Sequence, residues 1–214
     1  MNEARLKQAE RWFLTKYPGG FAHPELAAVG KKHRLEKMQA FVEESFAKKK
    51  FRDTDDLLTD WVKLVSRASL VSIFEKPKFR DLVSNLTPKE KNRFTAGLKA
   101  QLHGDQEKGF EQVLQILLRY KFAKWSIISL APVYANPQDE VFVKPTTAKG
   151  IISYLELDNL VYRPQPSWEF YTEFRHQIAR LRTRVDPSIA PNNPAFTGFL
   201  MMALRAGEEL SGRP

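Results

Sequence analysis

A turn that combines two lysines with two threonines is the first place where this sequence could bind a ligand. Residues 143–150 read Val-Lys-Pro-Thr-Thr-Ala-Lys-Gly, which is typical of a short strand followed by a proline turn and a helix. If Thr146 caps that helix, the amides of Thr147 and Ala148 point outward at its positive end. We therefore predict an anion or phosphate site formed by Lys144, Thr146, Thr147 and Lys149. The alternative is a simple threonine cap with both lysines in solvent, and the glycine-rich order of a P-loop is missing.

A second candidate segment, residues 66–81, interleaves basic residues with phenylalanines. Its candidates for binding the phosphates of a nucleic acid are Arg67, Lys76, Lys78 and Arg80. Phe74 and Phe79 would stack on bases if they were exposed. Because phenylalanine is usually buried, the sequence favours the alternative in which both rings anchor the loop in the core.

A third group of basic residues lies near residue 31. Its nucleic-acid-binding candidates are Lys31, Lys32 and Arg34, with Lys37 one turn further on. On an ideal helix these residues spread around the axis. They therefore raise the local positive potential without defining a groove, and a solvated helix surface is the alternative.

The positive charge of the chain is unevenly distributed along the sequence. The chain has 34 basic and 25 acidic residues, which gives a formal net charge of +9. Residues 1–122 contain 24 basic and 16 acidic residues, a net of +8, and the remainder contributes +1. A basic surface favours acidic partners such as nucleic acid, but it does not determine the fold.

Residues suited to catalysis or metal binding are few. The four histidines fall on separate expected elements, and no two of them have metal-ligand spacing. The absence of cysteine excludes disulfides, thiolate metal sites and a cysteine nucleophile. No serine stands in the pattern of a nucleophile elbow. We expect no metal site and no cofactor, and an active site would have to be assembled in three dimensions.

Hydrophobic spacing predicts a mainly helical fold. Apolar residues recur three and four apart through residues 1–122, and Gly30 is expected to kink the second helix. Thr87-Pro-Lys-Glu90 has the pattern of a capping box with proline at the first helical position. The residues predicted to be buried are Trp61, Leu64, Val65, Phe110, Leu114, Leu117, Phe174, Ile178 and Leu181.

The second half of the chain is expected to contain a small β element. Residues 126–130, 140–144 and 159–163 are short, rich in β-branched or aromatic residues, and bounded by prolines. We therefore expect six to eight helices and two or three short strands. The chain is interpreted as a single domain, residues 1–214. A subdivision into a basic helical part, 1–122, and a mixed part, 123–214, stays open.

Part of the second half carries a resemblance to other proteins. Residues 144–147 read Lys-Pro-Thr-Thr, and residues 162–171 follow the pattern Tyr-x-Pro-x-Pro-x-Trp-x-x-Tyr. Together with Ala-Lys-Trp-Ser at 123–126, this resembles a segment that recurs in a family of bacterial proteins of unassigned function. Similar segments accompany some restriction-like or nucleic-acid-handling proteins. The resemblance implies a compact bacterial module and transfers no catalytic residue.

The leading functional hypothesis is a protein that binds an anionic partner, with nucleic acid as the first candidate. One alternative is an interaction module that binds a protein, or a second copy of itself, through the apolar segment between Phe196 and Leu204. Another is an enzyme acting on a small phosphorylated or carboxylated substrate near residues 144–149. No apolar run approaches the ~20 residues of a membrane span, and the first residues lack a signal-peptide core. We therefore expect a soluble cytoplasmic protein without a membrane partner.

Overall fold

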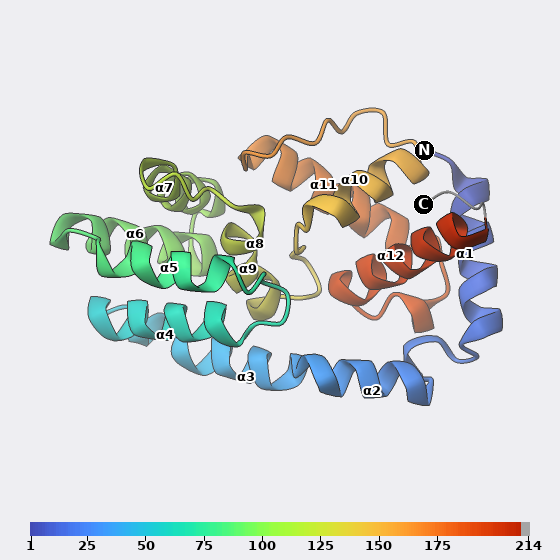
Figure 1. The fold of residues 1–214 in the computed structure, drawn as a ribbon, viewed down its shortest axis with the longest axis horizontal. Helices are drawn as coiled ribbons and strands as arrows, with labels where there is room; N and C mark the ends of the chain where they lie inside the picture. Colours follow the sequence, from blue (N-terminus) through green and yellow to red (C-terminus); the bar gives the residue numbers. More distant parts are fainter. Residues whose placement is uncertain (211–214) are drawn as a thin grey trace. The chain divides into compact units, whose positions relative to one another are not determined.

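The computed structural model describes residues 1–210, apart from the side chains of residues 31–33 and 208–210. Within these residues the secondary structure is helical, without a β-strand (Figure 1). The chain forms two compact units. Unit 1 consists of Met1–Lys32, Pro137–Arg163 and Glu169–Pro214, and unit 2 of His33–Asn136 and Pro164–Trp168. Each unit contains residues from both sides of Phe122, so neither unit matches the subdivision into residues 1–122 and 123–214. The interpretation as a single domain stays a prediction.

Unit 2 is a packed group of helices with an aromatic centre. Its helices are α3 (Leu35–Ser45), α4 (Thr54–Arg67), α5 (Glu75–Ser84), α6 (Pro88–His103), α7 (Gln106–Arg119), α8 (Trp125–Ile128) and α9 (Leu130–Ala135), with the short 3-10 helix η2 (Lys48–Lys50). The ring of Trp61 on α4 stacks on Phe94 of α6 with the centroids 4.3 Å apart. Phe79 of α5 lies 5.6 Å from the same tryptophan. These three rings fasten α4, α5 and α6 to one another, and offset stacking adds to the free energy of burial.

Two glycines allow α6 and α7 to lie side by side (Figure 1). A Cβ atom on Gly109 would lie 2.7 Å from the carbonyl oxygen of Gly97, and one on Gly97 would lie 3.1 Å from the amide nitrogen of Val113. Helix backbones approach this closely only where a side chain is missing from the contact. Helix packing, and not turn geometry, therefore requires a glycine at position 109.

Local capping signals begin several helices as the sequence predicts. Thr87 accepts a hydrogen bond from the amide of Glu90, and the Glu90 carboxylate accepts one from the Thr87 amide, so the capping box of α6 is confirmed. The break between α2 (Pro24–His33) and α3 falls elsewhere than expected. It lies at Arg34, whose φ of 54° is left-handed, and Gly30 stays inside α2.

Unit 1 packs its C-terminal helix into its own core. Its elements are α1 (Glu3–Lys16), η1 (Gly20–Ala22), most of α2, α10 (Pro145–Tyr154), most of α11 (Trp168–Arg182), η3 (Pro187–Ile189) and α12 (Asn193–Leu210). Phe199 of α12 meets Phe13 of α1 edge-on at 5.1 Å. Phe196, Phe199 and Leu200 are buried. These residues of the apolar segment between Phe196 and Leu204 therefore pack inside unit 1.

The expected strand at residues 126–130 is wrong, because these residues belong to α8 and α9. Every residue from Trp125 to Tyr134 is buried. A short segment that is buried on all sides reads as a continuous apolar run, and such a run does not distinguish a strand from a helix. Pro132 is accommodated near the start of α9, where a missing amide hydrogen leaves no helical bond unmade.

The segments 140–144 and 159–163 have no regular secondary structure and pair with no strand among the described residues. Instead of a neighbouring strand, side chains bond to the backbone of the first segment. Asn193 donates a hydrogen bond to the carbonyl of Glu140 at 3.1 Å. The strands expected here are wrong, and burial does not alternate in the first segment, because the neighbours Glu140 and Val141 are both buried.

The core prediction from helical spacing is confirmed, because all nine residues named for it are buried. Six of the nine lie on α4 and α7, the helices with the most amphipathic faces, which explains why their spacing was informative. Among the described residues, no helix is both long and apolar enough to cross a membrane.

Candidate functional site

The loop between α4 and α5 carries the most exposed large apolar side chains of unit 2. Ile73 is 71% exposed and Phe74 is 74% exposed, whereas Phe79 on α5 is fully buried. The preferred interpretation of the sequence, in which both phenylalanines anchor the loop, is therefore right for Phe79 and wrong for Phe74. An adjacent pair of exposed apolar side chains is a feature that often marks a binding surface.

The backbone on both sides of this pair is anchored. The amide of Phe74 donates to the hydroxyl of Ser72 at 3.3 Å, and the amide of Glu75 donates to the Ser72 carbonyl at 3.0 Å. The Glu75 carboxylate accepts a hydrogen bond of 2.7 Å from the buried hydroxyl of Ser126. Val71, just before the loop, is buried. The loop therefore presents Phe74 from a defined backbone and engages the nearest carboxylate internally.

Basic residues stand on both flanks of α5 directly after the exposed ring. Phe74 has helical backbone angles, so Lys78, four residues later, lies on the same flank of the helix. Lys76 and Arg80 are also four residues apart and occupy the other flank. Lys78 and Arg80 are exposed and Lys76 is half-buried. All three lie within the first two turns of the helix.

Arg67 extends this basic region from the end of α4. Its guanidinium lies over the ring of Phe41 on α3, 5.1 Å from the ring centroid. Stacking on an aromatic ring holds the planar guanidinium while leaving N–H groups free to bond to another molecule. Lys37 lies one turn before Phe41 on α3 and is exposed, as is Arg34. The sequence placed Lys37 beside the third basic group, but Phe41 was not a candidate, because its contact with Arg67 joins two helices and has no sequence signal.

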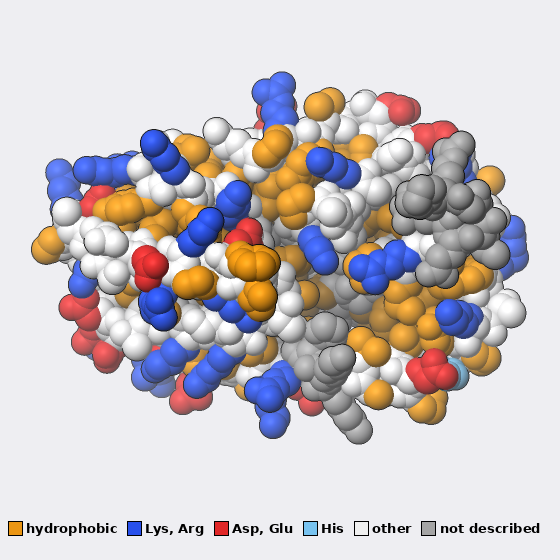
Figure 2. All heavy atoms as spheres, viewed as in Figure 1, with side chains coloured by type: hydrophobic (Ala, Val, Ile, Leu, Met, Phe, Trp, Pro, Cys, Tyr) orange, Lys and Arg blue, Asp and Glu red, His pale blue; other side chains and the backbone are white. Residues whose placement is uncertain are grey.

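We call this region the α4–α5 surface. It consists of Arg34, Lys37, Arg67, Ile73, Phe74, Lys76, Lys78 and Arg80. Figure 2 shows blue lysine and arginine side chains over this group of helices, with orange apolar side chains between them. The structure thus brings five sequence candidates onto one unit. The other two, Lys31 and Lys32, have side chains that lie outside the described part of the structure.

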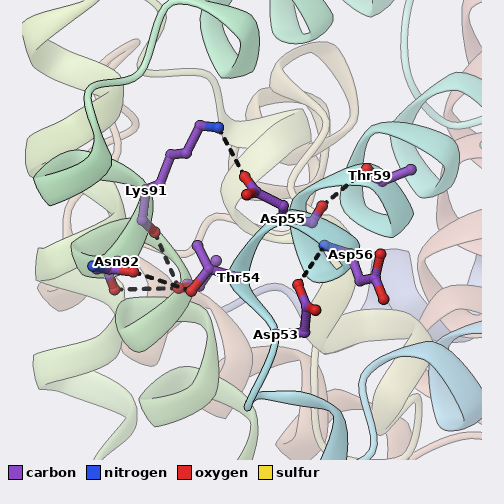
Figure 3. A network of polar contacts seen from close by, with 8 residues as sticks. Asp53, Thr54, Asp55, Asp56, Thr59, Lys91 and Asn92 are labelled. Atoms are coloured by element: carbon purple, nitrogen blue, oxygen red, sulfur yellow. Dashed lines mark hydrogen bonds and ion pairs between the residues drawn. The ribbon is translucent and has the colours of Figure 1, made fainter.

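The opposite end of α4 is acidic. Asp53 caps the helix by accepting a hydrogen bond from the amide of Asp56, and Asp55 pairs with Lys91 at 2.8 Å (Figure 3). Asp60 pairs with Lys63 at 2.9 Å. Negative side chains at the start of a helix stabilise its dipole, so this group has a structural role. The 14 residues of α4 place its acidic end about 20 Å from Arg67.

The turn at residue 144 differs from the expected anion site in its details. Lys144 is the N-cap of α10, and Thr146 does not cap it, because Pro145 takes the first helical position. The amide of Ala148 is bonded to the Lys144 carbonyl at 2.8 Å and does not point at a ligand. The Lys149 ammonium lies over the ring of Tyr162 at 5.1 Å. The four-residue anion site itself stays a prediction.

A buried ionic network lies in unit 1. The buried Glu140 carboxylate accepts a hydrogen bond of 2.6 Å from the hydroxyl of Tyr171 and pairs with Arg175 at 2.7 Å. Burial and the charge of Glu140 raise the pKa of Tyr171 well above its usual value, so the phenol stays protonated and donates. The network fastens segment 140–144 to α11, which is a structural role.

The cavities of the structure give little support to the enzyme hypothesis. A cavity of about 230 Å³ in unit 1 is lined by Met1, Leu157, Asp158, Asn159, Leu160, Gln177 and Arg180. Its titratable side chains are one carboxylate and one guanidinium, which do not form a nucleophile with a base. A cavity of similar size in unit 2 lies at the acidic start of α4. Within the described residues, no histidines or carboxylates are grouped to hold a metal ion.

Comparison with known proteins adds no information to this geometry. No family model, curated protein or solved structure matches the chain. The resemblance over residues 123–171 stays a prediction. What supports a function is therefore the surface chemistry of the chain itself.

Proposed function

We propose that this protein binds nucleic acid through the α4–α5 surface of unit 2. The observation that carries the proposal is the exposed ring of Phe74, which is held by an anchored loop and followed within two turns by three cationic side chains. Lysine and arginine neutralise phosphates, and an exposed aromatic ring offers a face to a base. A nucleic acid is the partner that uses both features together.

The distribution of charge supports the same partner. Unit 2 contains 19 basic and 13 acidic residues, a net of +6, whereas unit 1 contains 15 and 12, a net of +3. Four carboxylates of unit 2, those of Asp53, Asp55, Asp56 and Asp60, lie at the N-cap and in the first half of α4, and Arg67 lies at its other end. The excess of cations in unit 2 favours a polyanion as its partner.

A protein partner is the main alternative. The apolar residues expected to supply that interface, Phe196, Phe199 and Leu200, are buried inside unit 1. Ile73 and Phe74 could still form the centre of a protein interface, and the cations around them would then select an acidic partner. The two partners differ in salt dependence, because only a nucleic acid releases condensed counterions in proportion to its phosphate contacts.

A pair of matched double variants tests the proposal. Lys76→Gln with Arg80→Gln removes two cations of the surface. Lys89→Gln with Arg93→Gln removes the same residue types at the same spacing from α6, beside the acidic end of α4. All four side chains lie at least partly in solvent, so both variants should fold.

The measurement is the fluorescence anisotropy of a labelled oligonucleotide at increasing potassium chloride. We expect the wild type to show a steep loss of affinity with salt. The α5 variant should lower the slope of log K against log salt by about 1.4–1.8, the share of two phosphate contacts, while the α6 variant changes it little. If both variants lowered the slope equally, the effect would come from net charge alone and not from the α4–α5 surface. No measurable binding by the wild type would overturn the proposal.

A further inference from the structure

We propose that the nucleic acid bound at the α4–α5 surface is single-stranded, with Phe74 stacking on an unpaired base. The inference rests on the proposed function and adds the class of substrate to it. Its starting point is the ring of Phe74, which has no aromatic or cationic partner among the described side chains. The nearby ring of Phe41 is different, because the guanidinium of Arg67 already covers one of its faces.

The position of Lys78 relative to the ring fits one nucleotide. Phe74 and Lys78 are four residues apart on one flank of α5, so their Cβ atoms lie about 5–6 Å apart. A base that stacks on the ring brings its own phosphate within reach of this lysine. Stacking on an aromatic ring tolerates every base, so the pair would bind without sequence preference.

A duplex does not fit the same arrangement. Its bases are stacked on one another, so Phe74 would reach a base face only by unstacking a step, which is energetically costly. Asp81 lies seven residues after Phe74 on the same flank, and its 63% exposed side chain pairs with Arg80 at 3.4 Å. A duplex lying along the whole of α5 would bring this carboxylate against its phosphates. A short single-stranded contact at the first turn avoids both difficulties.

The exposed pair is also too small to be a membrane anchor. Stable binding to a bilayer requires the apolar face of an amphipathic helix or two separate anchoring signals. Ile73 and Phe74 are two side chains on one loop, and α5 buries its apolar face against unit 2.

The test compares Phe74→Ala with wild type on a single strand and on the duplex of the same sequence. We expect wild type to prefer the single strand, and Phe74→Ala to weaken single-strand binding by about 5- to 100-fold, the effect of losing one base stack. Duplex affinity should change by less than about twofold, because the duplex offers no stack to lose. Val161→Ala, at an equally exposed apolar residue of unit 1, is the matched control and should leave both affinities unchanged.

A second variant reports on base stacking directly. In Phe74→Trp the fluorescence of the new indole should be quenched when a single strand binds. The circular dichroism spectrum of the variant should match that of the wild type. Equal affinity of Phe74→Ala and wild type for the single strand, or an unquenched indole, would overturn single-strand stacking. The proposed function would survive that result if Lys76→Gln with Arg80→Gln still lowered the salt slope. Binding only to vesicles of phosphatidylserine and phosphatidylcholine, with a blue shift of the indole, would overturn both.

Discussion

The hydroxyl of Tyr171 lies 2.6 Å from a carboxylate oxygen of Glu140, and both side chains are buried in unit 1. The same carboxylate binds Arg175 on its other oxygen. The Tyr171 hydroxyl therefore replaces part of the hydration that the Glu140 carboxylate loses on burial. A buried charge is tolerated only when its hydrogen-bonding capacity is met. The stability of unit 1 should depend on this one hydroxyl.

Tyr171→Phe should lower the free energy of unfolding by about 1.5–3 kcal/mol, the usual contribution of a hydrogen bond to a charged group. Urea denaturation at neutral pH measures this difference. Tyr154→Phe is a suitable comparison, because that hydroxyl bonds to the neutral carbonyl of Arg5 and is half-buried. It should cost about 0.5–1.5 kcal/mol. Equal losses would mean that Glu140 is satisfied without Tyr171.

Tyr134 offers the opposite case in unit 2. Its hydroxyl is buried without a hydrogen-bond partner in the part of the chain that the structure describes. An unsatisfied buried hydroxyl costs about 1–3 kcal/mol, so Tyr134→Phe should leave stability unchanged or raise it by up to about that amount. Thermal unfolding checks the sign. A clear loss of stability would mean that this hydroxyl has a partner in solution.

The same tyrosine predicts a dependence of stability on alkaline pH. Burial raises the pKa of Tyr134 to about 12, above the value of 10 for a free phenol. The folded state therefore holds its proton more tightly, and the resulting stability is complete below pH 10 and is lost as pH rises toward 12. In that range wild type should lose up to about 1.4 kcal/mol per pH unit more than Tyr134→Phe. Parallel pH profiles of the two proteins would contradict this prediction.

Two glycine-to-alanine substitutions distinguish the effect of packing on stability from the effect of helix propensity. Gly198 lies in α12 with nothing within 4 Å of an added Cβ atom, so Gly198→Ala should raise stability by about 0.5–1 kcal/mol. Gly109→Ala places the same methyl group against the backbone of α6 and should lower stability by about 1–3 kcal/mol. Urea denaturation that reports on both units measures the difference. A neutral Gly109→Ala would show that α6 and α7 can move apart easily.

The sequence predicted the helices and their buried faces because these are local properties. Trp61, Leu64 and Val65 recur along one side of α4, and Thr87 with Glu90 forms the capping box of α6 within one turn. Such patterns depend on residues three or four positions apart. They need no knowledge of which helices meet.

The errors arose where a distant contact decides the outcome. Residues 126–130 are helical and lie in the interior of unit 2. Segment 140–144 contacts helices and not a strand. Glu75, next to the exposed Phe74, bonds to Ser126, a residue 51 positions away. The association of Phe41 with Arg67 likewise joins two helices. No periodicity in the sequence carries this information.

The lysines of the turn at residue 144 give the last prediction. Lys149 lies over Tyr162 and Lys144 is exposed, so both charges remain available to an anion although the amide of Ala148 is engaged. An anion there would be held mainly by charge, because Pro145 has no amide hydrogen and the Ala148 amide is bonded to Lys144. Lys144→Gln with Lys149→Gln should therefore weaken oligonucleotide binding less than Lys76→Gln with Arg80→Gln. The melting temperature should change little, because exposed lysines contribute little to stability. Salt-dependent anisotropy compares the two double variants, and a larger loss from the unit 1 lysines would move the principal binding surface to α10.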